Sequence, residues 1–271
     1  MKRILVFEAH GDDMEFLAGG TIAKFCALGH DVTVVVATDN DKGSFEQSAE
    51  EMRAVRDNEL NGAARVLGVS RMIPLGYSDG DLAFQTTPNK LRGQFMRIIR
   101  EVKPDIVFTW DPFAPNEGHA DHRAVAVAAG EAASFAHFPL YYPDQIAEGL
   151  PAHYVSEQWF FSKSAYSQNK FVDIDGHIEK KILALYQHEA QMVLTIADMQ
   201  HHLRASGLSV PWLAELDPHS YHETIARRMK AAGRMVARQS GMTCTYAEGF
   251  RRTRYGGIES LAKDQTLPED V

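Results

Sequence analysis

The sequence predicts an α/β fold of the Rossmann-like, doubly wound type: a mostly parallel sheet with helices on both faces and a helical C-terminal extension. Short apolar runs rich in β-branched residues alternate with segments whose apolar residues recur at helical spacing. Polar residues directly follow two of these runs, where strands of such sheets end and ligands bind. We expect one domain over residues 1–271, with a core over about 1–165 and a helical part over about 175–271.

The first half of the chain supplies four buried strands and the helices between them. The strands are expected at Ile4–Phe7, Asp31–Ala37, Met72–Leu75 and Asp105–Trp110. The helices are expected from Gly19 to Leu28, over Phe45–Leu67 and over Leu91–Val102. With right-handed crossovers the strand order becomes 3-2-1-4, so the first and fourth strands are neighbours.

The second half of the chain is expected to be mainly helical. A fifth strand at Val155–Phe161 is predicted to end the sheet. The predicted helices are Ala124–Ala133, Ile178–Leu203 and Tyr221–Arg238. The last of these is rich in arginine and is expected to be solvated or to face another subunit, so Trp212, Tyr221 and this helix could support a homo-oligomer.

The composition of the chain indicates which kinds of partner are disfavoured and which cellular compartment is expected. The chain has 45% hydrophobic residues and a net charge of -8, which disfavours nucleic acid or an anionic membrane surface as the main partner. Its two cysteines cannot build a disulfide framework, and no apolar run approaches a signal peptide or a membrane span. We therefore expect a cytoplasmic protein whose partner is a small molecule.

Two polar clusters follow the first and the fourth strand. The clusters are His10, Asp12 and Asp13, and His119, Asp121 and His122. Because the two strands are predicted neighbours, both clusters should meet across one crevice. A catalytic zinc site uses three protein ligands and leaves one position open, and His10, Asp13 and one histidine of the second cluster would supply such a set. Read alone, the first cluster could also be a turn with a helix cap.

These motifs resemble those of the LmbE-like (PIG-L) family of zinc-dependent de-N-acetylases, Ala-His-Pro-Asp-Asp-Glu and His-x-Asp-His. The resemblance covers about residues 3–195. Further matching stretches are Thr38–Gly43, Gly76–Gly80, Lys103–Asp105 and His188–Gln191. Gly11 replaces the family proline, and Met14 stands in place of the glutamate, with Glu15 following. We therefore give Glu15 no catalytic role.

The resemblance implies a metal centre and a general base. His10, Asp13 and His122 are the implied ligands of one Zn²⁺ ion per chain, with another divalent transition metal as the alternative. Asp12 is the implied general base that takes a proton from the attacking water.

Four further residues receive implied roles outside the ligand set. His119 would stabilise the oxyanion and protonate the leaving amine, while Asp121 would fix the tautomer of His119 and raise its pKa. Arg56 and Asp79 are candidate substrate contacts. From the residues alone, Arg56 is expected in a solvated ion pair with Glu59, and Asp79 in an ordinary turn. The histidine at 188 is expected to pack or to lie at the surface.

The implied reaction is removal of an N-acetyl group from a soluble N-acetylglucosamine-type derivative, giving acetate and a free amine. A non-haem Fe(II) oxygenase would share the two-histidine, one-carboxylate set, but such sites usually accompany an all-β barrel. A catalytically silent Rossmann-like binding module is a further alternative. A nucleotide-binding Rossmann protein is disfavoured, because the first turn lacks the G-x-G-x-x-G pattern.

Overall fold

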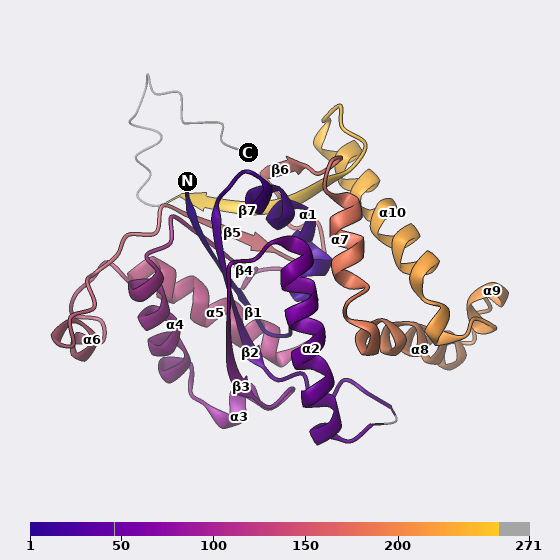
Figure 1. Ribbon diagram of the computed structural model, residues 1–271, viewed down its shortest axis with the longest axis horizontal. Coiled ribbons are helices and arrows are strands. Elements are labelled where there is room, and N and C mark those ends of the chain that lie inside the picture. Colours follow the sequence, from indigo (N-terminus) through magenta and orange to yellow (C-terminus); the bar gives the residue numbers. More distant parts are fainter. Residues whose placement is uncertain (46, 255–271) are drawn as a thin grey trace.

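The computed structural model, which describes residues 1–45 and 47–254, contains one seven-stranded sheet in the order β3-β2-β1-β4-β5-β7-β6 (Figure 1). The strands are β1 (Arg3–Glu8), β2 (Asp31–Thr38), β3 (Arg71–Tyr77), β4 (Ile106–Trp110), β5 (Glu157–Phe161), β6 (Lys170–Asp173) and β7 (Ala247–Arg254). Strands β1 to β5 pair in parallel, whereas β7 is antiparallel to β5 and β6. The predicted α/β class and the 3-2-1-4 order are confirmed.

Helices cover both faces of the sheet. The longer ones are α1 (Asp13–Ala27), α2 (Ala49–Leu67), α4 (Pro88–Val102), α5 (Ala120–Phe135), α7 (Ile178–Leu185), α8 (Glu189–Ser206) and α10 (His222–Ser240). The short ones are α3 (Leu82–Gln85), α6 (Pro143–Ala147), α9 (Pro211–Ala214) and a 3₁₀ turn at Pro218–Ser220. Figure 1 shows α1, α2 and α7 on one side of the sheet and α4 and α5 on the other.

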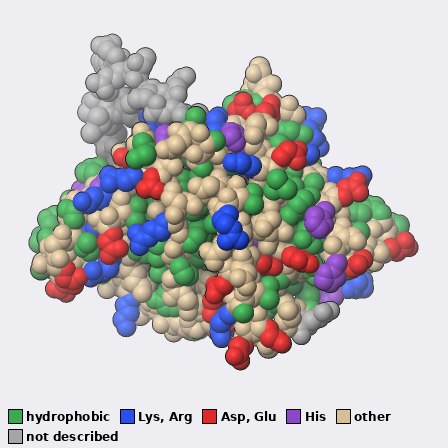
Figure 2. Space-filling view, viewed as in Figure 1, with side chains coloured by type: hydrophobic (Ala, Val, Ile, Leu, Met, Phe, Trp, Pro, Cys, Tyr) green, Lys and Arg blue, Asp and Glu red, His purple; other side chains and the backbone are tan. Residues whose placement is uncertain are grey.

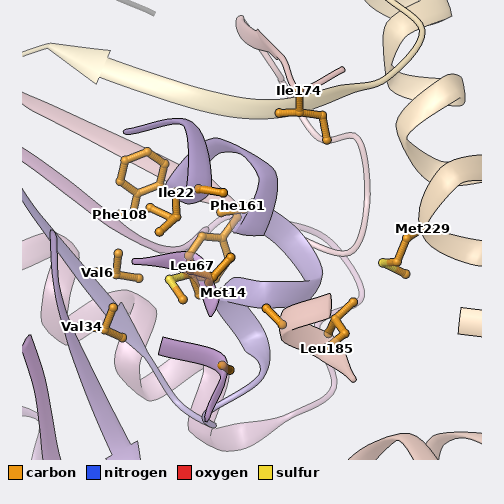
Figure 3. Close-up of a cluster of buried hydrophobic side chains, with 14 of the residues drawn as sticks. Val6, Met14, Ile22, Val34, Leu67, Phe108, Phe161, Ile174, Leu185 and Met229 are labelled. Carbon is orange, nitrogen blue, oxygen red and sulfur yellow. The ribbon is translucent and has the colours of Figure 1, made fainter. Parts of the chain in front are cut away.

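Side chains that point alternately to the two faces of the sheet form two hydrophobic cores. Val6, Val34 and Phe108 face the cluster that includes α1, α2 and α7, which Figure 3 shows in close-up. Their neighbours Leu5 and Val107 face the cluster under α4 and α5. Because successive side chains of a strand point to opposite faces, continuously apolar strands are what a sheet covered on both sides requires.

The expectation that the fifth strand ends the sheet is wrong. Strands β7 and β6 extend it beyond β5, so the C-terminal part is not only helical. Within β7, Phe250 is buried, and Arg251 forms a two-pronged ion pair with Asp111. Because charged residues interrupt its apolar pattern, the sequence did not indicate this strand. Residues 255–271 of the expected C-terminal part lie outside the described residues.

The helix expected over Ile178–Leu203 is broken into α7 and α8. The backbone N–H of Ala190, in the first turn of α8, donates to Glu59 Oε1 of α2 at 2.7 Å. A free N–H at a helix start is therefore satisfied by a side chain that is distant in sequence. The break carries His188, which is 1% exposed, into the interior.

The helix starts near the polar loops also differ from expectation. Helix α1 begins at Asp13 rather than near Gly19, so the first polar cluster is itself a helix N-terminus. Helix α2 begins only at Ala49, after Ser48, whose side chain and that of Glu51 form a capping box. Gly68 closes α2 in a left-handed conformation.

The surface features bear on the expected partners. Figure 2 shows acidic and basic side chains interspersed on the face in view. Of the aromatic residues suggested for a subunit contact, Trp212 is 60% exposed, but Tyr221 is buried in the core, so its assignment to that contact is wrong. Within residues 1–45 and 47–254, no helix combines the length and the apolar character that crossing a membrane requires.

Candidate metal and catalytic site

The two polar clusters meet at the carboxyl edge of the sheet, because β1 and β4 are paired neighbours. His10 Nδ1 lies 3.0 Å from His122 Nε2, and Asp13 Oδ1 lies 3.3 Å from His122 Nε2 and 3.8 Å from His10 Nδ1. Ligands of a tetrahedral metal at about 2.0–2.1 Å are separated by about 3.4 Å. These three donor atoms therefore fit one small divalent cation.

The second oxygen of Asp13 is fully occupied by the protein. Asp13 Oδ2 accepts hydrogen bonds from the backbone N–H groups of Ala9 and His10, both at 3.0 Å, and from Trp110 Nε1 at 2.7 Å. Trp110 also stacks on the ring of His122, with centroids 3.9 Å apart. The carboxylate is thus held so that Oδ1 faces the two histidines. Sequence reasoning placed Trp110 at the end of its strand without recognising this role.

The second ring nitrogen of His122 faces a glutamate that the sequence did not single out. Its Nδ1 lies 3.1 Å from Glu117 Oε1, which also accepts the backbone N–H of His119 and pairs with Lys163. Burial alone would raise the pKa of Glu117, but the N–H of His119 and the charges of His122 and Lys163 lower it. An ionised carboxylate behind a histidine orients its other nitrogen toward a metal.

His10 is held in the same way by two aspartates. Its Nε2 lies 3.0 Å from Asp79 Oδ1 and 3.6 Å from Asp121 Oδ2. Burial opposes charge on His10, yet hydrogen bonds with Asp121, Asp13 and Asp79 raise its pKa well above the ordinary value. The carboxylates thus stabilise a positive charge at this point. Asp79, expected in an ordinary turn or as a substrate contact, contacts this ring.

His119 and Asp121 differ from expectation in how they interact. The backbone N–H of Asp121, and not its carboxylate, donates to His119 Nδ1 at 3.3 Å. The carboxylate instead accepts the N–H of Gly80 at 2.6 Å. Burial and the neighbouring His10 and His122 lower the pKa of His119, so the expected rise is wrong. With Nδ1 accepting, neutral His119 carries its proton on Nε2.

Asp12 is the residue before α1 and is paired with a buried arginine. Arg56 Nη2 lies 3.5 Å from Asp12 Oδ1, and Arg56 Nη1 donates to Glu59 Oε2 at 2.9 Å. Arg56 is only 4% exposed, so the expected solvated pair with Glu59 is a buried one. In this structure Arg56 lines a small cavity of about 290 Å³ beside the site.

The larger cavity, of about 730 Å³, opens from the donor cluster. Its lining at this end includes Asp12 and Asp79 together with the rings of His10, His119 and His122. Its opposite wall comes from α8 and α10. Glu15 and His188 do not line this cavity; they are buried, with His188 Nε2 3.6 Å from Glu15 Oε1. Glu15 thus lies away from the larger cavity, whereas His188 also lines the small cavity beside the site.

Gly11 lies close to the side chain of Leu60 in α2. A Cβ on Gly11 would lie 2.9 Å from Leu60 Cδ1, too close for an ordinary contact. We expect Gly11→Ala to lower the free energy of unfolding by about 1 kcal/mol, since Leu60 must move within the core. Thermal denaturation measures the effect, with Gly176→Ala as the control, because a Cβ at Gly176 meets nothing within 4 Å. Equal stability of the two variants would contradict this role for Gly11.

Comparison with known proteins gives a family match and similar enzymes. The model of the family described as "GlcNAc-PI de-N-acetylase" (PIG-L) matches residues 5–133. A diacetylchitobiose deacetylase of Thermococcus kodakarensis is 32% identical over 83% of this chain and 82% of that protein. A 1D-myo-inositol 2-acetamido-2-deoxy-alpha-D-glucopyranoside deacetylase of Mycobacteroides abscessus is 29% identical over 80% of this chain and 90% of that protein.

A solved structure resembles the whole described fold. The N,N'-diacetylchitobiose deacetylase from Pyrococcus horikoshii, complexed with an inhibitor, superposes with a TM-score of 0.76. The two sequences are 26% identical, and the match covers 99% of this chain and 88% of that one. The similarity thus extends beyond the N-terminal region to the C-terminal helices.

Proposed function

Because this chain belongs to the PIG-L (LmbE-like) family of de-N-acetylases, we propose that it is a metal-dependent hydrolase of N-acetylated amino sugars. The products are acetate and a free amine on the sugar. The observation that carries the proposal is the convergence of His10 Nδ1, Asp13 Oδ1 and His122 Nε2 within 3.8 Å of one another. Asp12 and His119 border the same cavity.

The donor set supports a Zn²⁺ ion, with another divalent transition metal as the alternative. Two imidazoles and one carboxylate are a common catalytic zinc set, and three protein ligands leave one position open. When bound, such an ion would polarise the acetamide carbonyl and lower the pKa of a nearby water. In support, carboxylates already stabilise a positive charge on His10, and Glu117 and Asp79 face the outward nitrogens of the two histidines.

Asp12 is the general base in this proposal. Its carboxylate lines the cavity next to the donor atoms, while Asp13 is held by three N–H groups and is not free to take a proton. Asp12 removes a proton from the water that attacks the acetamide carbon. When the C–N bond breaks, Asp12 can pass this proton to the leaving nitrogen. The same carboxylate thus acts first as base and then as acid. The ion pair with Arg56 orients the carboxylate.

His119 supplies the hydrogen-bond donor for the developing oxyanion. Its Nδ1 accepts the N–H of Asp121, so the proton is on Nε2, which lies 3.8 Å from Asp79 Oδ1. The ring lines the cavity, and its side chain is 38% exposed. An N–H donor at such a position stabilises charge that appears only in the transition state. Asp121 supports the site through its backbone and through His10.

Acetate release tests the proposal directly. We expect the purified protein to contain close to one metal ion per chain, and to release acetate from methyl N-acetylglucosaminide. Treatment with a chelator should abolish release, and Zn²⁺ should restore it, because the ligand set cannot act without a cation. The control is the same protein incubated with chelator already saturated with Zn²⁺.

The outcomes separate the alternatives. Metal with no acetate from any N-acetylated sugar would contradict the reaction class. Bound iron with substrate-dependent oxygen consumption would favour the oxygenase, which shares the donor set. A chain that binds the sugar without metal or turnover would be the silent binding module.

A further inference from the structure

The cavity is larger than one acetylated sugar ring needs. Pockets of about 300–1,000 Å³ hold ligands of drug size, and this one measures about 730 Å³. The donor cluster occupies one end. The far wall comes from α8 and α10, which lie outside the family-matched residues 5–133. The far wall is therefore contributed by the C-terminal part of this chain.

Several apolar side chains line that part of the cavity. Leu194 and Met199 of α8 and Met229 of α10 line it opposite Phe16 and Leu17 of α1. Met229 is anchored in the core, with 6% exposure, and its position beside α10 is visible in Figure 3. Thioether side chains adapt to irregular apolar ligands. The same wall also carries the polar side chains Gln191, Thr195, Asp198 and His202.

One cation on this wall has no carboxylate partner. Arg228 of α10 contacts Met199 Sδ at 3.7 Å and forms no ion pair within the described part of the chain. The other cations of the cavity are paired, Lys42 with Asp81 and Lys163 with Glu117. The nearby Asp198 faces His202 at 3.5 Å. Arg228 can therefore offer its guanidinium to an anion.

We propose that the far wall is an aglycone subsite for an apolar, aromatic-sized group that ends in an anion. The apolar body contacts the Met and Leu side chains, and a carboxylate or phosphate at its end meets Arg228. This inference rests on the proposed deacetylase function, because the acetamide must lie at the donor cluster for the aglycone to reach α10.

Glycosides of N-acetylglucosamine test the subsite. Their kcat/KM for acetate release is compared for methyl, phenyl, 4-carboxyphenyl, 4-phosphophenyl and 4-(aminomethyl)phenyl groups. We expect phenyl to exceed methyl about tenfold, because the ring buries apolar area. A carboxylate or phosphate on the ring should raise kcat/KM about fivefold over the phenyl glycoside, as expected for a partly exposed ion pair. The two anionic probes show whether carboxylate or phosphate is preferred.

Variants assign the effect to residues. Arg228→Met should lower the ratio of 4-carboxyphenyl to phenyl kcat/KM about fivefold, and Arg228→Lys should retain part of it. Arg227→Met is the matched control, because Arg227 pairs with Glu223 on the same helix, is 77% exposed and does not line the cavity. Met199→Gln should lower the ratio of kcat/KM for the phenyl glycoside to kcat/KM for the methyl glycoside.

The results distinguish this proposal from the function itself. If no glycoside releases acetate, the proposed function fails. If all glycosides react with equal kcat/KM, or if the cationic probe is the best, the function stands and the aglycone subsite is wrong. Loss of anion preference in Arg227→Met as well as in Arg228→Met would also contradict it, because a general charge effect would then suffice.

Discussion

Asp12→Asn is expected to retain its metal and to lose roughly 10²–10⁴-fold in turnover, the range for removal of a general base. The substitution keeps the shape of the side chain but removes its ability to take a proton. Metal content should not change, because Asp12 supplies none of the three converging donor atoms. Metal analysis and acetate release on the same preparation measure both quantities.

The control for Asp12→Asn is Asp144→Asn, which makes the same chemical change on the exposed helix α6. This control should keep both metal and turnover. Loss of metal from Asp12→Asn would mean that the roles of the two adjacent aspartates are exchanged. Turnover within about threefold of the parent would place the base elsewhere. A comparison of melting temperatures excludes unfolding, which could follow from the loss of the ion pair with Arg56.

The sequence predicted those parts of the fold that depend on local pattern. Buried strands such as Asp31–Thr38 are mostly apolar, because both of their faces are covered. Their order followed from handedness rules, and this order brought His10 and His122 together across about a hundred residues. The meeting of the two clusters was thus foreseeable without any coordinates.

The features that sequence missed depend on long-range contacts. The break between α7 and α8 is compensated by Glu59, which is 131 residues away from Ala190. Strand β7 pairs with β5 and β6, and its Arg251 binds Asp111, which is 140 residues away. Neither contact leaves a trace in apolar periodicity, which records burial and not the partner of a polar group.

The supporting residues of the site were hidden for a related reason. Glu117 lies in an irregular loop, and its role depends on its position next to Nδ1 of His122. Trp110 reads as the last apolar residue of a strand, although its indole N–H binds Asp13. A buried carboxylate that binds a metal through one oxygen needs a hydrogen-bond donor for the other oxygen. A search for such a donor near Asp13 would have been a useful signal.

The tautomer of His119 shows how backbone geometry can replace a side chain. The family resemblance implied that the carboxylate of Asp121 would hold the ring. In the structure His119 caps α5, and the helix itself supplies the N–H that meets Nδ1. The carboxylate is thereby released to meet Gly80 and His10. One short motif thus supports two histidines.

A second large effect is expected at Asp13, and it decides which ligand set is used. The donor atoms of His10, His119 and His122 also lie within 4.8 Å of one another, so three histidines are an alternative set. Asp13→Asn must keep an acceptor oxygen toward its three N–H donors. Its NH₂ group would then face His10 and His122, and this group cannot ligate a metal.

We therefore expect Asp13→Asn to weaken metal binding by more than about a hundredfold, beyond the 10–100-fold typical of an outer-shell partner. Acetate release should fall with it, because the metal is lost. His119→Ala is the matched comparison: it should keep its metal and lose roughly a hundredfold in turnover, as for one oxyanion donor. The reverse pattern, with metal lost only from His119→Ala, would assign the site to three histidines and leave Asp13 as a support for His10 and His122.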